Sequence, residues 1–232
     1  MICGVDEAGR GPVMGPLVVA AVMVRDDQSL RELGVADSKL LTRRRREELD
    51  GHIRELAKVE MVVVNAAEID EFMRNNNLNL LEVKHFAVLI ERLRPGKVFI
   101  DAADVVEERF GRRVQELLTC RPDMVCEHKA DLTYPVVSAA SIIAKVARDN
   151  IMDQIQESIG RPIGSGYAHD EVTIEFIRTW LKETGSLPPH VRSSWKTAKD
   201  LISISKVSKL TDWMDSDDGR ATAAGPRKQV QR

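Results

Sequence analysis

Two adjacent carboxylates, Asp6 and Glu7, stand near the start of the chain in the stretch GVDEAGRGP. Successive side chains on a strand point to opposite faces, so both acids can enter one site only where the strand ends or twists. The glycine turn that follows, Gly9-Arg10-Gly11, permits such a change of direction. The stretch therefore predicts either a surface hairpin turn or half of a site where metal ions and a phosphate meet.

Two more aspartates stand at the ends of predicted elements. Asp101 closes the apolar run KVFI, and Asp131 lies between a short strand and a long helix. Functional side chains of α/β sheets gather at such strand ends. Four carboxylates would repel one another without cations, and hard oxygen ligands suit Mg²⁺ or Mn²⁺. A chain with 36 acids also places some at element ends by chance. Asp104 competes with Asp101, although a helix-capping role suits Asp104 better.

Other polar patterns in the chain admit structural interpretations. The glycine turn does not fit GxxxxGK[ST], which disfavours a nucleoside-triphosphate loop. The five histidines show no metal-ligand spacing, so solvated or capping roles are expected for them. The run from Arg43 to Arg46 is typical of a solvated helix face. It is also a local basic patch in a chain of net charge -2, and a phosphate-rich partner would need such a patch.

Length and composition predict a soluble protein of one or two domains. Of the 232 residues, 43% are hydrophobic and 30% are charged, as in ordinary globular proteins. Three cysteines without a CxxC pair suggest reduced thiols in a cytoplasmic protein. The N-terminus lacks the pattern of a signal peptide, and no apolar run is long enough for a membrane span.

Apolar patterns predict strands that alternate with helices, and hence a mixed α/β sheet with helices packed on it. Leu49, Ile53 and Leu56 have the spacing of an amphipathic helix. The predicted strands cover residues 1–5, 16–24, 58–66, 97–102 and 123–128. The predicted helices cover residues 37–56, 78–94, 105–118, 136–159, 171–183 and 194–205.

Several stretches occur in the order found in ribonuclease HII: GVDEAGRGPVMGPLVVAAV, DSKLLT, IDAAD, EHKADLTYPVVSAASIIAKVARD and GSGY. Over about residues 1–200 the chain resembles an archaeal-type member of that family. The resemblance implies a ribonuclease H-like fold, with a five-stranded mixed sheet flanked by helices and a smaller C-terminal helical part. The implied division is a catalytic domain over residues 1–160 and a helical substrate-binding part over 161–205. The resemblance does not cover residues 206–232, which are expected to form a mobile tail because they lose apolar periodicity and are rich in charge, Gly and Ala.

The resemblance also implies an activity and its residues. Members hydrolyse the RNA strand of RNA–DNA hybrids and cut 5′ to single ribonucleotides in duplex DNA, leaving 3′-OH and 5′-phosphate ends. They serve ribonucleotide excision and primer removal. The catalytic, metal-binding acids match Asp6, Glu7, Asp101 and Asp131, which settles Asp101 over Asp104 and implies two Mg²⁺ or Mn²⁺ ions. Substrate-binding positions match the backbone of Gly9, Arg10 and Gly11, the ring of Tyr167, and the side chains of Lys39 and Arg46. Lys145, on the predicted helix after Asp131, is a further candidate for a phosphate contact.

Alternatives and partners remain open at this point. Another ribonuclease H-like nuclease, such as a junction resolvase or a hybrid-only enzyme, would carry similar acids. A non-enzymatic hybrid-binding module with a degenerate site is disfavoured because all four acids are present. Family members can carry a clamp-binding peptide at the C-terminus, but the stretch LTDWMDSDDGR does not support one. The chain is expected to act as a monomer, without membrane contact.

Overall fold

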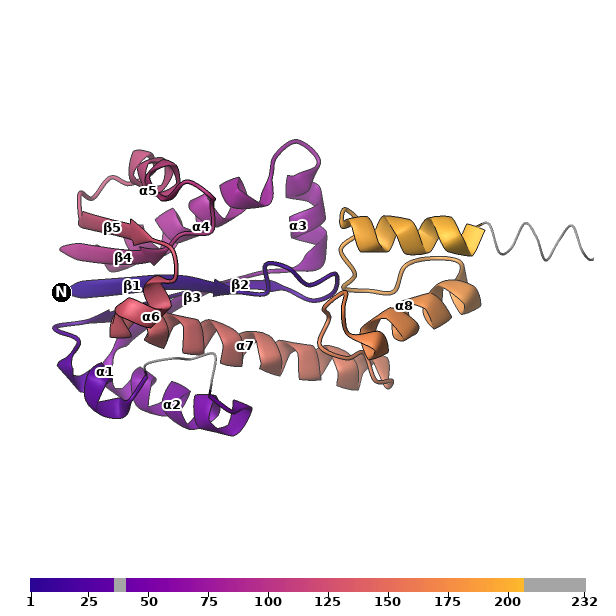
Figure 1. Ribbon diagram of the computed structural model, residues 1–232, viewed down its shortest axis with the longest axis horizontal. Helices are drawn as coiled ribbons and strands as arrows, with labels where there is room; N and C mark the ends of the chain where they lie inside the picture. The colour runs from indigo at the N-terminus through magenta and orange to yellow at the C-terminus, as the bar shows by residue number, and fades with distance from the viewer. Residues whose placement is uncertain (36–40, 207–232) are drawn as a thin grey trace, which may run out of the picture.

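The computed structural model describes residues 1–35 and 41–206 and contains a five-stranded sheet (Figure 1). The strand order is β3-β2-β1-β4-β5, in which β1 pairs antiparallel with β2 and parallel with β4. This arrangement confirms the mixed α/β sheet. The strands are β1 (Ile2–Ala8), β2 (Leu17–Val24), β3 (Lys58–Val64), β4 (Lys97–Asp101) and β5 (Asp123–Glu127).

Strand pairing brings two of the predicted acids to one edge of the sheet. The parallel ladder between β1 and β4 pairs Val5 with Ile100. The next residue on each strand is an aspartate, Asp6 on β1 and Asp101 on β4, so the two lie side by side where the ladder ends. The register thus joins positions that are far apart in the sequence.

Helices cover both faces of the sheet (Figure 1). One face packs against α4 (Leu78–Leu93) and α5 (Glu107–Glu116), with Phe86 and Phe110 in edge contact at the centre of that core. The other face packs against α2 (Arg43–Leu56) and the long helix α7 (Pro135–Ile159).

The C-terminal part packs against the far end of α7, beyond the sheet (Figure 1). It comprises α8 (Glu171–Thr184) and a helical segment at residues 196–206. Its apolar core also takes in Val13 and Met14, which follow the glycine turn. No helix in the described part of the chain is long and apolar enough to cross a membrane.

Several predicted boundaries are wrong in detail. Strand β1 continues through Ala8 instead of ending at Val5, because β2 pairs with it up to Val18. Three short helices were not predicted: α1 (Gln28–Leu33), α3 (Ala66–Met73) and α6 (Ala130–Thr133). Their length leaves little periodicity to detect.

Helix α2 also differs from its prediction. Thr42 caps its N-terminus by accepting a hydrogen bond from the Arg45 amide, so α2 begins at Arg43 and the predicted helix does not run through residues 41 and 42. Residues 37–40 of the predicted helix lie outside the described residues. Leu49 and Ile53 are buried, but Leu56 is 49% exposed and does not belong to the apolar face.

Candidate active site

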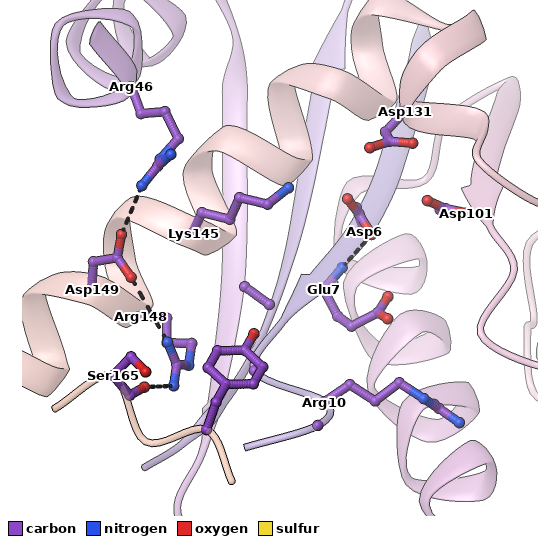
Figure 2. A pocket seen from close by; sticks show the side chains of 14 residues that line it. Asp6, Glu7, Arg10, Arg46, Asp101, Asp131, Lys145, Arg148, Asp149 and Ser165 are labelled. Atoms are coloured by element: carbon purple, nitrogen blue, oxygen red, sulfur yellow. Dashed lines mark hydrogen bonds and ion pairs between the residues drawn. The ribbon is translucent and has the colours of Figure 1, made fainter. Parts of the chain in front are cut away.

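An open pocket of about 520 Å³ lies where β1 and β4 end (Figure 2). Every predicted site residue within the described part of the chain lines it, whereas Lys39 lies outside the described residues. The predicted residues that line it are Asp6, Glu7, Gly9, Arg10, Gly11, Arg46, Asp101, Asp131, Lys145 and Tyr167. The structure therefore brings together positions that lie between residue 6 and residue 167 of the sequence.

Three of the acids form a tight group, which we call the aspartate cluster: Asp6, Asp101 and Asp131. One carboxylate oxygen from each lies within 4.8 Å of the others (Figure 2). Asp6 comes from β1, Asp101 ends β4, and Asp131 stands in the first turn of α6. The amide of Lys129, a residue with φ of 57°, donates to Asp101 at 2.9 Å and so ties the approach to α6 to the end of β4.

Glu7 lies in the same pocket but outside the aspartate cluster. Because β1 continues through both acids, their side chains leave opposite faces of the strand. Asp6 faces Ser141 and Lys145 of α7, whereas Glu7 faces Glu82 of α4. The two carboxylates therefore approach the pocket from different sides of the sheet.

Burial makes the carboxylates of Asp6, Glu7 and Asp101 hard to ionise. Desolvation raises the pKa of Asp101 to about 6, and the charges of Asp6 and Asp131 act in the same direction. It also raises the pKa of Glu7 well above its ordinary value, helped by Asp6. Burial raises the pKa of Asp6 too, although the Lys145 ammonium opposes this shift. A cation among these groups would relieve the repulsion.

The donor set fits a hard divalent cation. The aspartate cluster offers carboxylate oxygens alone, which suit Mg²⁺ or Mn²⁺ better than softer metals. The Oε2 atom of Glu7 is buried and has no hydrogen-bond partner, so it retains a lone pair for a further ligand bond. These acids could therefore hold metal ions together.

Asp104, the rival of Asp101, serves a different purpose. Its carboxylate is 2% exposed and forms an ion pair with Arg109 of α5. It accepts a hydrogen bond from the Val106 amide at 3.4 Å, but the N-cap of α5 is Val106 itself. The capping position predicted for Asp104 is thus wrong by two residues.

The glycine turn borders the pocket opposite the aspartate cluster. Gly9 has φ of 89°, and a Cβ atom there would lie 2.4 Å from the carbonyl oxygen of Pro16. The side chain of Arg10 reaches α4, where it pairs with buried Glu82 and donates to Asn79 Oδ1 at 2.7 Å. A Cβ atom at Gly11 would lie 3.8 Å from Tyr167 Cε1. The turn and the tyrosine ring are therefore neighbours.

Of the arginine run in α2, Arg46 alone lines the pocket. It donates to Asp149 of α7 at 3.1 Å and to the Leu41 carbonyl at 2.9 Å. Lys145 of α7 also lines the pocket and donates to Ser141 Oγ. Both cations are held by contacts within the protein while they face the pocket (Figure 2).

Sequence reasoning missed several pocket residues. Arg148 and Asp149 lie three and four positions after Lys145, so helical spacing on α7 could have indicated them. The Arg148 guanidinium lies 5.2 Å from the centre of the Tyr167 ring and donates to the Ser165 carbonyl at 2.8 Å. Glu82 does not line the pocket itself, but it pairs with Arg10, which does, and no local signal in the sequence points to that contact.

The family model of ribonuclease HII matches residues 3–198. The chain belongs to the ribonuclease HII family. It is therefore a ribonuclease H, a nuclease that acts on RNA–DNA hybrids. The ribonuclease HII of Methanocella arvoryzae is 44% identical over 212 residues, covering 90% of this chain and 95% of the relative.

Solved structures support the same assignment. The crystal structure of ribonuclease H2 from Pyrococcus horikoshii OT3 matches with a TM-score of 0.83 and 39% identity, covering 88% of this chain and 98% of that one. The PCNA:RNase HII complex from Archaeoglobus fulgidus matches with a TM-score of 0.80 and 43% identity, covering 87% and 96%. The ribonuclease H-like fold is thereby confirmed.

Proposed function

We propose that this ribonuclease H cuts the RNA strand of RNA–DNA hybrids and also cuts 5′ to a single ribonucleotide embedded in duplex DNA. Its products carry 3′-OH and 5′-phosphate ends. The observation that carries the proposal is that the aspartate cluster, the glycine turn and Tyr167 line one pocket. In such a pocket the phosphodiester bond lies next to the sugar that is inspected.

The four acids are proposed to hold two Mg²⁺ or Mn²⁺ ions when substrate is bound. When bound, such ions activate a water and stabilise the leaving 3′-oxygen. Asp6, Glu7 and Asp101 would hold the ions, with Glu7 reaching them from the other face of β1, and Asp131 completes the site and helps to orient that water. The lone pair left on Glu7 Oε2 and the raised pKa of Asp101 support this assignment.

Recognition of the ribonucleotide is proposed to fall to the glycine turn and Tyr167. Distinguishing RNA from DNA requires a contact to the 2′-hydroxyl, which both donates and accepts. The backbone of the glycine turn makes that contact, because glycine leaves its amide and carbonyl groups accessible. Tyr167 stacks on the following deoxyribose and rejects a second 2′-hydroxyl there. Lys39, Arg46 and Lys145 contact the substrate phosphates.

The enzyme is proposed to act as a monomer on nucleic acid, with roles in ribonucleotide excision and primer removal. The clamp complex of the Archaeoglobus fulgidus relative is a property of that protein. Residues 207–232 lie outside the described part of this chain, and their sequence does not support a clamp-binding peptide. We therefore do not extend the proposal to a clamp.

Product mapping on a DNA duplex with one embedded ribonucleotide tests this proposal. We expect one cut on the 5′ side of the ribonucleotide in the presence of Mg²⁺, and no cut when EDTA is added. An all-DNA duplex of the same sequence is the matched control and should stay intact. Cleavage of a four-way junction instead would favour a resolvase, and cleavage of long hybrids alone would favour a hybrid-only enzyme.

A further inference from the structure

A buried arginine from the C-terminal part reaches back to the glycine turn. The Arg192 side chain has no exposed surface and is among the largest fully buried side chains of the described residues. Its guanidinium donates three hydrogen bonds to backbone carbonyl oxygens: Nη2 to Gly9 at 2.6 Å, Nη1 to Arg10 at 3.1 Å and Nε to Gly15 at 3.0 Å. The Arg192 side chain thus contacts both the glycine turn and Gly15, four residues after it.

Trp195 adds a contact to the third carbonyl of the glycine turn. Its indole Nε1 donates to the Gly11 carbonyl at 3.2 Å, and its ring centre lies 4.8 Å from the Arg192 guanidinium. The Arg192 amide itself donates to the Val13 carbonyl at 2.8 Å. All three carbonyl groups of the glycine turn therefore accept hydrogen bonds from residues 192–195.

The chemistry of arginine suits this arrangement. A planar guanidinium carries five N–H donors in a fixed fork, whereas the lysine ammonium is a compact point charge. Within residues 1–35 and 41–206, no carboxylate lies within ion-pair distance of Arg192. Burial instead lowers the pKa of Arg192 to about 10, and Arg148 contributes in the same direction. The fold thus buries a cation whose hydrogen-bond partners are carbonyls of the glycine turn and of Gly15.

The base of Arg192 is itself held in place by α3. Asp70 of α3 accepts hydrogen bonds from the Ser193 amide at 2.7 Å, the Ser193 hydroxyl at 2.8 Å and the Ser194 amide at 3.0 Å. The glycine turn is therefore connected to α3 through Arg192 and the two serines that follow it. Such a chain of contacts restricts where the turn can lie.

We propose that Arg192, assisted by Trp195, is a positioning residue that sets the glycine turn against the bound sugar. The C-terminal part thus controls ribose recognition from behind the pocket. This inference rests on the proposed role of the glycine turn in reading the 2′-hydroxyl. Neither side chain needs to touch the substrate in this role. We therefore expect substitution of either residue to lower kcat and to make the glycine turn more mobile, with little effect on KM.

Two variants of the full chain test the inference by hydrogen–deuterium exchange and by cleavage kinetics. Arg192→Lys keeps the charge but loses the fork, and Trp195→Phe loses only the indole N–H. We expect amide exchange at residues 9–15 to rise in both, while exchange in the five strands stays parental. We expect kcat on a single-ribonucleotide duplex to fall roughly ten- to hundredfold with little change in KM, since a small misplacement suffices for such a loss. Arg178→Lys, at an exposed ion pair on α8, is the matched control and should behave like the parent.

Two results would overturn the inference. One is parental exchange at residues 9–15 in both variants. The other is a rise in exchange across all five strands with a matching fall in Tm, because that would indicate a purely structural role. If the parent chain itself fails to cut the single-ribonucleotide duplex, the proposed function is wrong. The exchange measurement would still decide whether Arg192 holds the turn.

Discussion

Asp6 and Asp101 share one difficulty, which is that burial and neighbouring carboxylates make each of them harder to ionise. Burial and mutual repulsion raise the pKa of Asp101 to about 6, and the same causes act on Asp6. Two backbone hydrogen bonds hold these carboxylates in place. The Lys129 amide donates to Asp101, and the Glu7 amide donates to Asp6 at 2.7 Å. A bound divalent cation would convert the repulsion into ligation.

Asp101→Asn should abolish cleavage while the fold remains intact. Removing a group that stabilises charge at such a centre costs about 10²–10³ in kcat, so we expect a loss of at least about that size. Cleavage of a single-ribonucleotide duplex is the measurement, with Tm as the control for folding. Asp123→Asn, at an exposed position at the start of β5, is the matched substitution and should leave turnover unchanged. Normal turnover by Asp101→Asn would contradict the assignment.

The same residue predicts a pH dependence in the absence of divalent cations. The pKa of Asp101 is about 6 in the folded chain and about 3.9 in an unfolded one. Between these values the folded state binds more protons, so this group lowers the free energy of unfolding as pH rises. In EDTA, the Tm of the parent should fall relative to that of Asp101→Asn from about pH 4 to pH 6. Parallel Tm curves over that window would refute the shift.

Tyr167 predicts a loss confined to one class of substrate. Tyr167→Ala removes the ring beside Gly11 and should sharply reduce cleavage at a single embedded ribonucleotide, whereas Tyr167→Phe keeps the stacking surface and should retain most of it. The ratio of kcat/KM between the single-ribonucleotide duplex and a long hybrid is the measurement. Equal activity of Tyr167→Ala and the parent on the single ribonucleotide would argue against stacking.

Strand β1 and helix α7 approach each other closely at Gly4. A Cβ atom at Gly4 would lie 2.3 Å from the carbonyl carbon of Val136, in the first turn of α7. This close packing brings Ser141 and Lys145, five and nine residues further along α7, against Asp6. The position of the aspartate cluster thus depends on the fit between one strand and one helix.

Gly4→Ala should therefore destabilise the protein. Overpacking of this kind typically costs about 1–3 kcal/mol, and a clash with backbone atoms lies at the upper end. Gly51→Ala is the matched control, because Gly51 lies within α2 with no atom near its Cβ position. The Gly51→Ala substitution should stabilise the protein by about 0.5–1 kcal/mol, since alanine is a better helix former than glycine. Chemical denaturation of both variants measures the difference, and a stability for Gly4→Ala equal to that of the parent would show that α7 can move away.

At the scale of the whole molecule, α7 joins the sheet to the C-terminal part. Its first half packs on β1 and β2, whereas Met152 and Ile155 near its end belong to the C-terminal core. Val13 and Met14 insert into that same core directly after the glycine turn. The predicted boundary at residue 160 therefore does not separate two hydrophobic cores, because residues on both sides of it share the C-terminal core. That residues 161–205 bind substrate stays a proposal.

A chain ending at residue 160 should not fold as a stable unit. It would expose the apolar side chains of Val13, Met14, Met152 and Ile155, and it would leave the glycine turn without Arg192. We expect a low soluble yield and the loss of a cooperative thermal transition, measured against the full chain. A cooperative transition at the parental Tm would show that residues 1–160 form an autonomous domain.

The sequence by itself determined the types of the main elements and most of the pocket residues. Strand alternation and helical periodicity are local properties, and the motifs around Asp6, Asp101 and Asp131 are read directly from residue order. The glycine turn and Tyr167 were found in the same way. Short helices such as α3 were not predicted, although Asn65 and Glu68 form a capping box at the start of α3 that could have been recognised in the sequence.

Only the tertiary structure decided how these residues are used. The continuation of β1 sends Asp6 and Glu7 to opposite faces, because strand length is set by pairing with β2 and not by the residues alone. The contact of Arg192 with Gly9 joins positions 183 residues apart, and no local pattern announces it. Such contacts arise because the C-terminal part packs on α7 and so brings residues that are far apart in the sequence close together in space.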